Sequence, residues 1–155
     1  PEGQIPGIFT ALVLYRYSLK RHKRWAHIQA LRQQGVAVVA DRYPQIEVPG
    51  FYDGPGLSAA HTSNPLILWL AARERALYQL MAAQLPTLVL RLNISMETAL
   101  ARKPDHEPDL LARKIAVTPR LTFNGAHIVE IDANRPYDDV LAAVTQAIDK
   151  ALGDS

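Results

Sequence analysis

The feature that most constrains the fold of this chain is a set of three short apolar runs, each followed further along by a stretch with helical periodicity. The runs occupy 36–40, 87–94 and 126–131. Apolar residues recur at helical spacing elsewhere, which predicts helices over 10–34, 65–84, 96–102 and 109–117, and a last helix after Pro136 that carries the apolar positions from Val140 to Leu152. Strands that alternate with helices form parallel sheets with right-handed crossovers. The sequence therefore predicts an α/β fold, a three-layer parallel sheet with helices on both faces.

Length and composition limit the number of domains, the chemistry and the location of the protein. The 155 residues, 48% of them hydrophobic, suit a single domain over 1–155 with a sizeable core. The chain has no cysteine, which excludes disulfides and thiolate metal sites and favours a cytoplasmic location. No apolar run reaches the roughly 18–20 residues needed to span a bilayer, so we expect no membrane partner.

The stretch 44–65 is rich in proline and glycine, which break both helices and strands. We expect it to form a long mobile loop, since irregular loops of this length are usually functional or mobile. Asn64 and Pro65 then open the next helix, because proline suits the first helical position.

A basic cluster lies in the first predicted helix, between Arg16 and Arg24. Two interpretations stand: a solvated helix face, or an anion site for phosphate groups. Nucleic-acid binding is disfavoured, because there is one cluster, little aromatic interleaving and no recognised motif. The five histidines show no metal-ligand spacing.

Polar residues follow the predicted strands, and ligands of open parallel sheets bind at that edge. Asp41 and Arg42 follow the first strand, and further candidates follow the other two at Asn93, Ser95, Asp132 and Asn134. Asp41 could hold a metal through water or orient a hydroxyl, and Arg42 could grip a phosphate. Alternatively, Asp41 caps the loop and Arg42 forms a structural ion pair. Glu74 and Tyr78 share a helix face four residues apart, either for packing or for a hydrogen bond in a cleft.

Several segments resemble thymidylate kinases and their relatives, especially bacterial thymidylate-kinase-like proteins of unassigned substrate. The stretch Gly35–Tyr43 (GVAVVADRY) resembles their strand and Asp-Arg-Tyr motif, and Thr87–Lys103 resembles the strand, helix and arginine that lead into their lid. The segment Ala126–Val140 resembles their last strand. Shorter likenesses are Asp53-Gly54-Pro55, the Glu-x-x-x-Tyr helix at Glu74 and Tyr78, and Ala101–Pro104.

The resemblance implies a role for each matched residue in phosphoryl transfer from ATP to a nucleotide or another small phosphate-bearing acceptor. Catalytic residues would be Asp41, Arg42 and Arg102, with Asp41 also assisting Mg²⁺ through water. Residues that contact the acceptor would be Arg42, Tyr43, Glu74, Tyr78 and Arg21. Counted back from Asp41 without gaps, Arg21 lies where these kinases place an arginine for the acceptor phosphate. A lid-like segment over 102–120 would reach the donor phosphates with Arg102, Lys103 and Arg113. Such positive charge suits a reaction whose catalysis is mostly positioning and electrostatics. The oligomeric state is open, with a homodimer among the candidates.

The chain departs from this family at its phosphate loop, because none of its eight glycines fits Gly-x-x-x-x-Gly-Lys-[Ser/Thr]. The implied domain is thus P-loop kinase-like but incomplete at its N-terminus. Three arrangements are open: the segment exists outside this sequence, the flanking strands pair directly, or another chain fills the gap. We expect this chain alone to be inactive. The alternative is a non-catalytic, degenerate kinase-like module that binds an anionic ligand or a partner through its basic helix.

Overall fold

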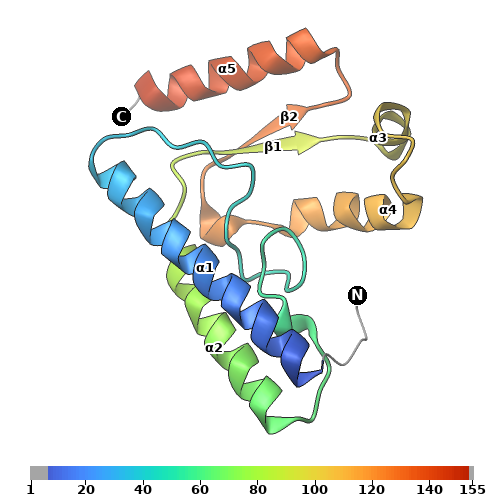
Figure 1. Cartoon of the computed structure of the whole chain (residues 1–155). Coiled ribbons are helices and arrows are strands. Elements are labelled where there is room, and N and C mark those ends of the chain that lie inside the picture. The colour runs from blue at the N-terminus through green and yellow to red at the C-terminus, as the bar shows by residue number, and fades with distance from the viewer. Residues whose placement is uncertain (1–6, 154–155) are drawn as a thin grey trace. The chain divides into compact units, whose positions relative to one another are not determined.

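The computed structural model describes residues 7–153, and the chain forms two compact units, 1–84 and 85–155 (Figure 1). Helices dominate the first unit, whereas the second contains a small sheet with three helices. The predicted helices are all confirmed: α1 (Ile8–Gln33), α2 (Pro65–Ala82), α3 (Met96–Arg102), α4 (Pro108–Val117) and α5 (Tyr137–Gly153). No helix among the described residues is long and apolar enough to cross a membrane.

In the first unit α1 and α2 run parallel to each other (Figure 1). Near their N-terminal ends Ala11 packs with Ile67 and Leu70, and near their C-terminal ends Trp25 packs with Tyr78 and Met81. Burial of these side chains stabilises the helix pair by roughly 25 cal/mol for each Å² of apolar surface removed from water. Polar contacts occupy the middle of the pair, between the two clusters.

Local sequence explains where α1 and α2 begin and end. Asn64 caps α2, since its side chain accepts from the backbone N–H groups of Leu66 and Ile67. Pro65 follows at the first helical position, as predicted. Gly35 lies just beyond α1 with φ +80°, the left-handed conformation that favours glycine after a helix.

The connection from α1 to α2 is irregular apart from the short 3₁₀ helix η1 (Leu57–Ala59), as predicted for 44–65. Its first part is built around Gln45, which is buried. The Gln45 amide donates to the carbonyls of Val48 (2.8 Å) and Phe51 (2.6 Å) and accepts from the N–H of Val48 (2.8 Å). Residues 45–55 therefore form a compact loop. The mobility expected for 44–65 as a whole stays a prediction.

The strand predicted over 36–40 is wrong for this structure. Within residues 7–153 only two strands form, and 36–40 pairs with neither. Val39 is 93% exposed. The physical reason is that a strand needs a neighbour for its backbone N–H and C=O groups, and no described segment pairs with this one.

The second unit contains the other two predicted strands, β1 (Val89–Asn93) and β2 (Ile128–Asp132). They pair in parallel, with Val89 opposite Ile128 and Asn93 opposite Asp132. Parallel pairing is what the alternation of strands and helices predicts. Two short 3₁₀ segments, η2 (Thr118–Arg120) and η3 (Phe123–Gly125), connect α4 to β2. A two-stranded sheet fits a three-layer fold without establishing it, so the three-layer, P-loop kinase-like architecture stays a prediction.

Candidate functional site

A buried carboxylate lies between α1 and α2. Glu74 is 1% exposed; its Oε1 accepts from the Ser18 hydroxyl at 2.7 Å, and its Oε2 accepts from the N–H of Leu57 at 2.7 Å. Burial raises the pKa of Glu74, while hydrogen bonds from Ser18 and from backbone amides of η1 oppose this shift. Glu74 thus ties both helices to η1.

One helical turn further on, Arg21 joins three elements of the first unit. Its Nη1 donates to the Tyr78 hydroxyl on α2, and its Nη2 lies 2.9 Å from Oδ1 of Asp53 in the connection. Tyr78 is 1% exposed, whereas the Arg21 side chain is 41% exposed. Burial raises the pKa of Tyr78, and the nearby Arg21 charge opposes this shift. The guanidinium is therefore held from two sides and still reaches solvent.

The Asp-Arg-Tyr motif divides between surface and core. Asp41 and Arg42 are exposed and form a loose ion pair with each other, at 3.8 Å between Oδ2 and Nε. Tyr43 instead packs its ring edge-on against Trp25, with centroids 4.8 Å apart, and its hydroxyl donates to the Gln84 carbonyl. Burial raises the pKa of Tyr43 to about 12, although the nearby Arg32 opposes this shift.

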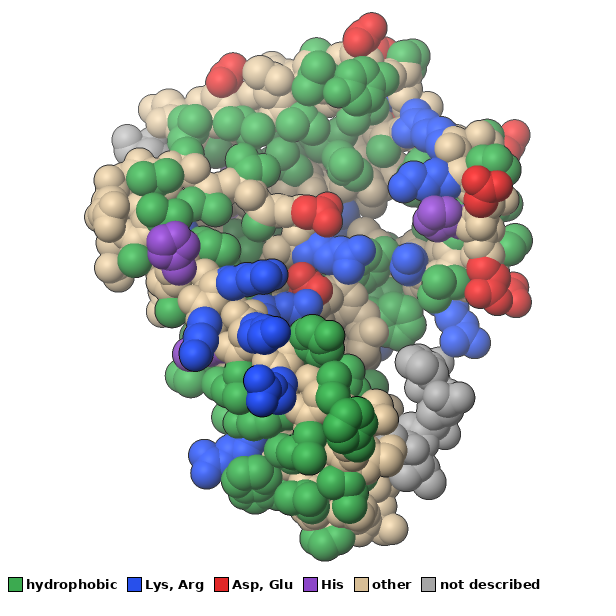
Figure 2. Space-filling model, in the orientation of Figure 1, with side chains coloured by type: hydrophobic (Ala, Val, Ile, Leu, Met, Phe, Trp, Pro, Cys, Tyr) green, Lys and Arg blue, Asp and Glu red, His purple; other side chains and the backbone are tan. Residues whose placement is uncertain are grey.

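The outward face of α1 is basic. Side chains three or four residues apart share this face and are exposed, and the helix contains no acidic residue. The members of this basic face are Arg16, Lys20, Lys23, Arg24 and His27. Figure 2 shows Lys and Arg side chains gathered over α1. The basic face therefore offers positive charge to an anion in solution.

The predicted lid residues lie in the second unit. Arg102 ends α3, and its Nη2 donates to the carbonyl of Arg135 at 3.0 Å. Lys103 follows α3 and Arg113 lies on α4, both exposed. These three cations thus lie on or next to α3 and α4.

The carboxyl ends of β1 and β2 meet at one edge, as parallel pairing requires. Asp132 accepts from the backbone and side-chain amides of Asn134, at 3.0 and 2.8 Å, and these bonds lower the pKa of Asp132. Asn134 in turn accepts from the N–H of Ser95 at 2.8 Å. A polar turn therefore joins the two strand ends.

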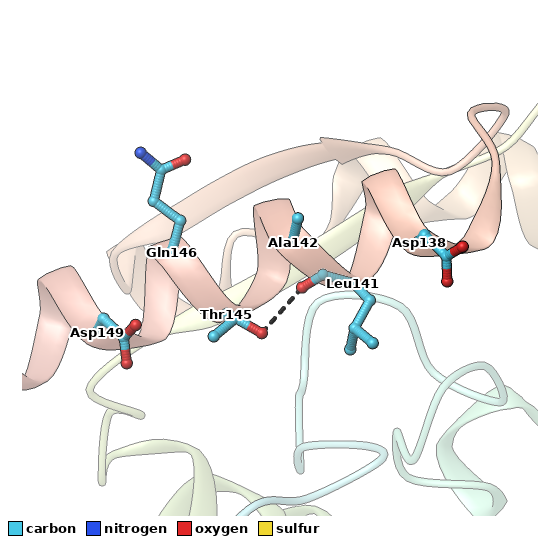
Figure 3. Close-up of a pocket in the computed structure, with 6 residues that line it drawn as sticks. All are labelled: Asp138, Leu141, Ala142, Thr145, Gln146 and Asp149. Carbon is cyan, nitrogen blue, oxygen red and sulfur yellow. Dashed lines mark hydrogen bonds between the residues drawn. The ribbon is translucent and has the colours of Figure 1, made fainter.

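A shallow, open pocket lies along an exposed face of α5, and its lining includes none of the predicted site residues. Figure 3 shows its lining, which comes from that one helix: Asp138, Leu141, Ala142, Thr145, Gln146 and Asp149. Thr145 donates back to the carbonyl of Leu141 at 3.0 Å, so its hydroxyl is already engaged. The lining side chains are exposed, and this surface offers no enclosed site for a ligand.

The structure unites some predicted residues and leaves others apart. Arg21 and Tyr78 form a direct contact, with Glu74 one turn away on α2. No hydrogen bond or ion pair between residues 7 and 153 links Asp41 or Arg42 to Arg21. Within the same range, no group of three or more His, Asp or Glu side chains could hold a metal ion.

Sequence reasoning missed two partners in this cluster, Ser18 and Asp53. Ser18 is a polar residue on the apolar face of α1, seven residues from both Ala11 and Trp25. A polar group at a core position needs a buried partner, which could have pointed to Glu74. Asp53 belongs to the Asp-Gly-Pro likeness, but nothing in the sequence pairs it with Arg21, because only the folded connection brings the two side chains together.

Two proteins of Escherichia coli are similar to this chain. The "uncharacterized ATP-binding protein YghS" is 50% identical over 148 residues, which are 95% of this chain and 62% of that protein. The "uncharacterized ATP-binding protein YghR" is 44% identical over 144 residues, 92% of this chain and 57% of that protein. The chain thus spans about three fifths of the length of these relatives. No protein-family model matches the chain. No solved structure matches it either.

Proposed function

We propose that this chain is the acceptor-binding part of an ATP-dependent nucleotide-kinase-like protein. The observation that carries the proposal is the contact set at Arg21: a guanidinium fixed by Tyr78 and Asp53 yet 41% exposed. A fixed and accessible guanidinium suits a phosphate group, which it can bind through parallel N–H bonds. Similarity to two proteins named as ATP-binding supports a nucleotide ligand.

The remaining residues have roles that follow from their chemistry. Arg42 is exposed and would provide a second cation for the acceptor phosphate. Asp41 would hold Mg²⁺ through water, because Mg²⁺ keeps several waters and binds through one or two carboxylates together with substrate phosphates. Mg²⁺ would neutralise charge on the transferring phosphoryl group. In the second unit, Arg102, Lys103 and Arg113 would approach the donor phosphates.

The donor phosphates need a further element. No phosphate loop occurs in residues 1–155, so in our proposal it belongs to the part of the whole protein outside this sequence. ATP-dependent phosphorylation is therefore expected of the full-length protein and not of this chain alone. Measurable turnover by the purified 155-residue chain would refute this division of roles.

Calorimetric titration of the chain with nucleoside monophosphates tests the acceptor site. Arg21→Ala and Arg42→Ala should each weaken binding by roughly tenfold or more, since hydrogen bonds to charged groups contribute about 1.5–3 kcal/mol. Arg75→Ala is a matched control, because Arg75 is an exposed arginine on α2. Equal binding by all three variants would contradict the acceptor site.

A second candidate function rests on the basic face of α1. A non-catalytic module would bind a polyanion there, with an affinity that falls steeply as salt is added. Charge reversal at Lys20 and Lys23 would abolish such binding and leave the response to nucleoside monophosphates unchanged. The two functions are thus separable with one set of variants.

A further inference from the structure

The ion pair between Arg21 and Asp53 indicates a role for Asp53, a residue that the proposed function leaves without one. We propose that Asp53 is a positioning residue, which orients the Arg21 guanidinium for the acceptor phosphate and does not itself contact the acceptor. This inference rests on the proposed function, because Arg21 is the acceptor arginine there.

The two partners of Arg21 hold different nitrogens of the same planar group. Tyr78 accepts from Nη1 on the α2 side, and Asp53 lies 2.9 Å from Nη2 on the side of the connection. A guanidinium has five N–H donors in a fixed fork, so two such contacts leave donors over for a phosphate. With one partner on each side, rotation of the fork is restricted.

Asp53 is itself held by a well-packed loop. Neighbouring Gly54 leaves no room for a side chain, since a Cβ there would lie 2.4 Å from Gln45 Nε2 and 2.6 Å from the Val48 carbonyl oxygen. The N–H of Gly54 also donates to the Phe51 carbonyl at 2.8 Å. Asp53 has φ +59°, a left-handed conformation that aspartate tolerates better than most residues.

The packing of this loop indicates that Asp53 orients Arg21 and does not compete with the acceptor phosphate for it. If the Asp53 carboxylate occupied the phosphate position, the acceptor would have to expel it, and the loop around Gln45 would have to open. The hydrogen bonds of Gln45 oppose that movement. Asp53 is only 23% exposed, whereas Arg21 is 41% exposed, so the guanidinium is the more accessible partner. An incoming phosphate therefore meets the arginine with its carboxylate anchor in place.

Positioning has a measurable benefit because a free arginine side chain has many rotamers. Fixing it before binding lowers the entropy lost when the acceptor binds. Loss of the anchor should therefore weaken binding by about tenfold without removing any contact to the ligand.

The test is calorimetry with dTMP and AMP on wild type, Asp53→Ala, Asp53→Asn, Arg21→Ala and the double variant Asp53→Ala/Arg21→Ala. We expect Asp53→Ala to weaken binding about tenfold and Asp53→Asn, which keeps an acceptor oxygen, to weaken it less. In the Arg21→Ala background Asp53→Ala should change nothing further, because Asp53 acts through Arg21. A general loss of structure would instead weaken both backgrounds equally.

A matched control is Glu130→Ala, which removes the carboxylate from the 2.6 Å ion pair with Arg91 in the second unit. It should leave binding unchanged. Tighter binding by Asp53→Ala, or an equal loss in both backgrounds, overturns the positioning role while the proposed function stands. Failure of wild type to bind either nucleotide, or binding unaffected by Arg21→Ala, overturns both.

Discussion

Glu74 provides the sharpest test of how the two helices are held together. Truncation in Glu74→Ala removes the acceptor of the Ser18 hydroxyl and of the Leu57 N–H, both at 2.7 Å. A buried donor without a partner costs about 1–3 kcal/mol, and the cavity left in a 1% exposed site adds to this. We expect a loss of about 3 kcal/mol in the free energy of unfolding of the first unit.

Glu74→Gln separates hydrogen bonding from charge. Its amide oxygen can still accept from Leu57, and its NH₂ group can donate to Ser18, whose hydroxyl then donates to the Leu14 carbonyl 3.3 Å away. Every buried polar group keeps a partner, so the loss should stay below about 1 kcal/mol.

Urea unfolding followed by tryptophan fluorescence measures both variants. Both tryptophans, Trp25 and Trp69, lie in the first unit, so the signal reports on that unit. The reasoning would be refuted if Glu74→Ala unfolded within about 0.5 kcal/mol of wild type. Equal losses in the alanine and glutamine variants would also refute it, because the charge itself would then be required.

The pH dependence of stability provides an independent check. The pKa of Glu74 is raised in the folded state, chiefly by burial, so the folded protein holds this proton more tightly than the unfolded chain. The stabilisation that the folded protein gains from holding this proton is present below the unfolded pKa of 4.5 and is lost as pH rises through the folded pKa. Glu74→Gln should remove this decline. A decline of equal size in the variant would assign the effect to another group.

Two further predictions concern the connection and its neighbours. Gly54→Ala should destabilise the first unit by about 2 kcal/mol, since its Cβ would collide with Gln45, whereas Gly56→Ala, with nothing within 4 Å, should stay within about 0.5 kcal/mol in the same urea assay. The difference in ultraviolet absorbance between wild type and Tyr43→Phe isolates one of the six tyrosines and should show Tyr43 titrating at about pH 12, and stability should fall as pH rises from 10 towards 12. Tyr43→Phe should reduce that fall, with the remainder due to Tyr78, and cost about 1 kcal/mol through loss of the bond to the Gln84 carbonyl; a transition near pH 10 in the difference titration would contradict the buried environment of Tyr43.

Helix periodicity and capping residues predicted the helices well because these signals are local. Asn64, Pro65 and Gly35 each act within a turn of their own position, and the structure confirms all three. The run 36–40 was misjudged for the opposite reason. Strand propensity is real there, but a strand exists only when a second segment pairs with it.

The candidate site shows the same contrast between local and distant information. Glu74 and Tyr78 could be paired from sequence, because residues four apart share one face of a helix. Their partners Ser18 and Arg21 lie 56 and 57 residues earlier in the chain. Only the folded connection determines that Asp53 and Leu57 arrive at the same place, and no periodicity encodes that meeting.

The parallel course of α1 and α2 sets a minimum length for the segment between them. Because α1 has 26 residues at 1.5 Å each, its far end lies about 39 Å from its start. The chain must travel most of that distance back before α2 can begin beside it, which takes about 12 fully extended residues. A connection shorter than that limit, whichever residues of 34–64 it kept, would force the second helix to turn antiparallel. Every contact between Glu74, Tyr78 and the first helix would then be lost together.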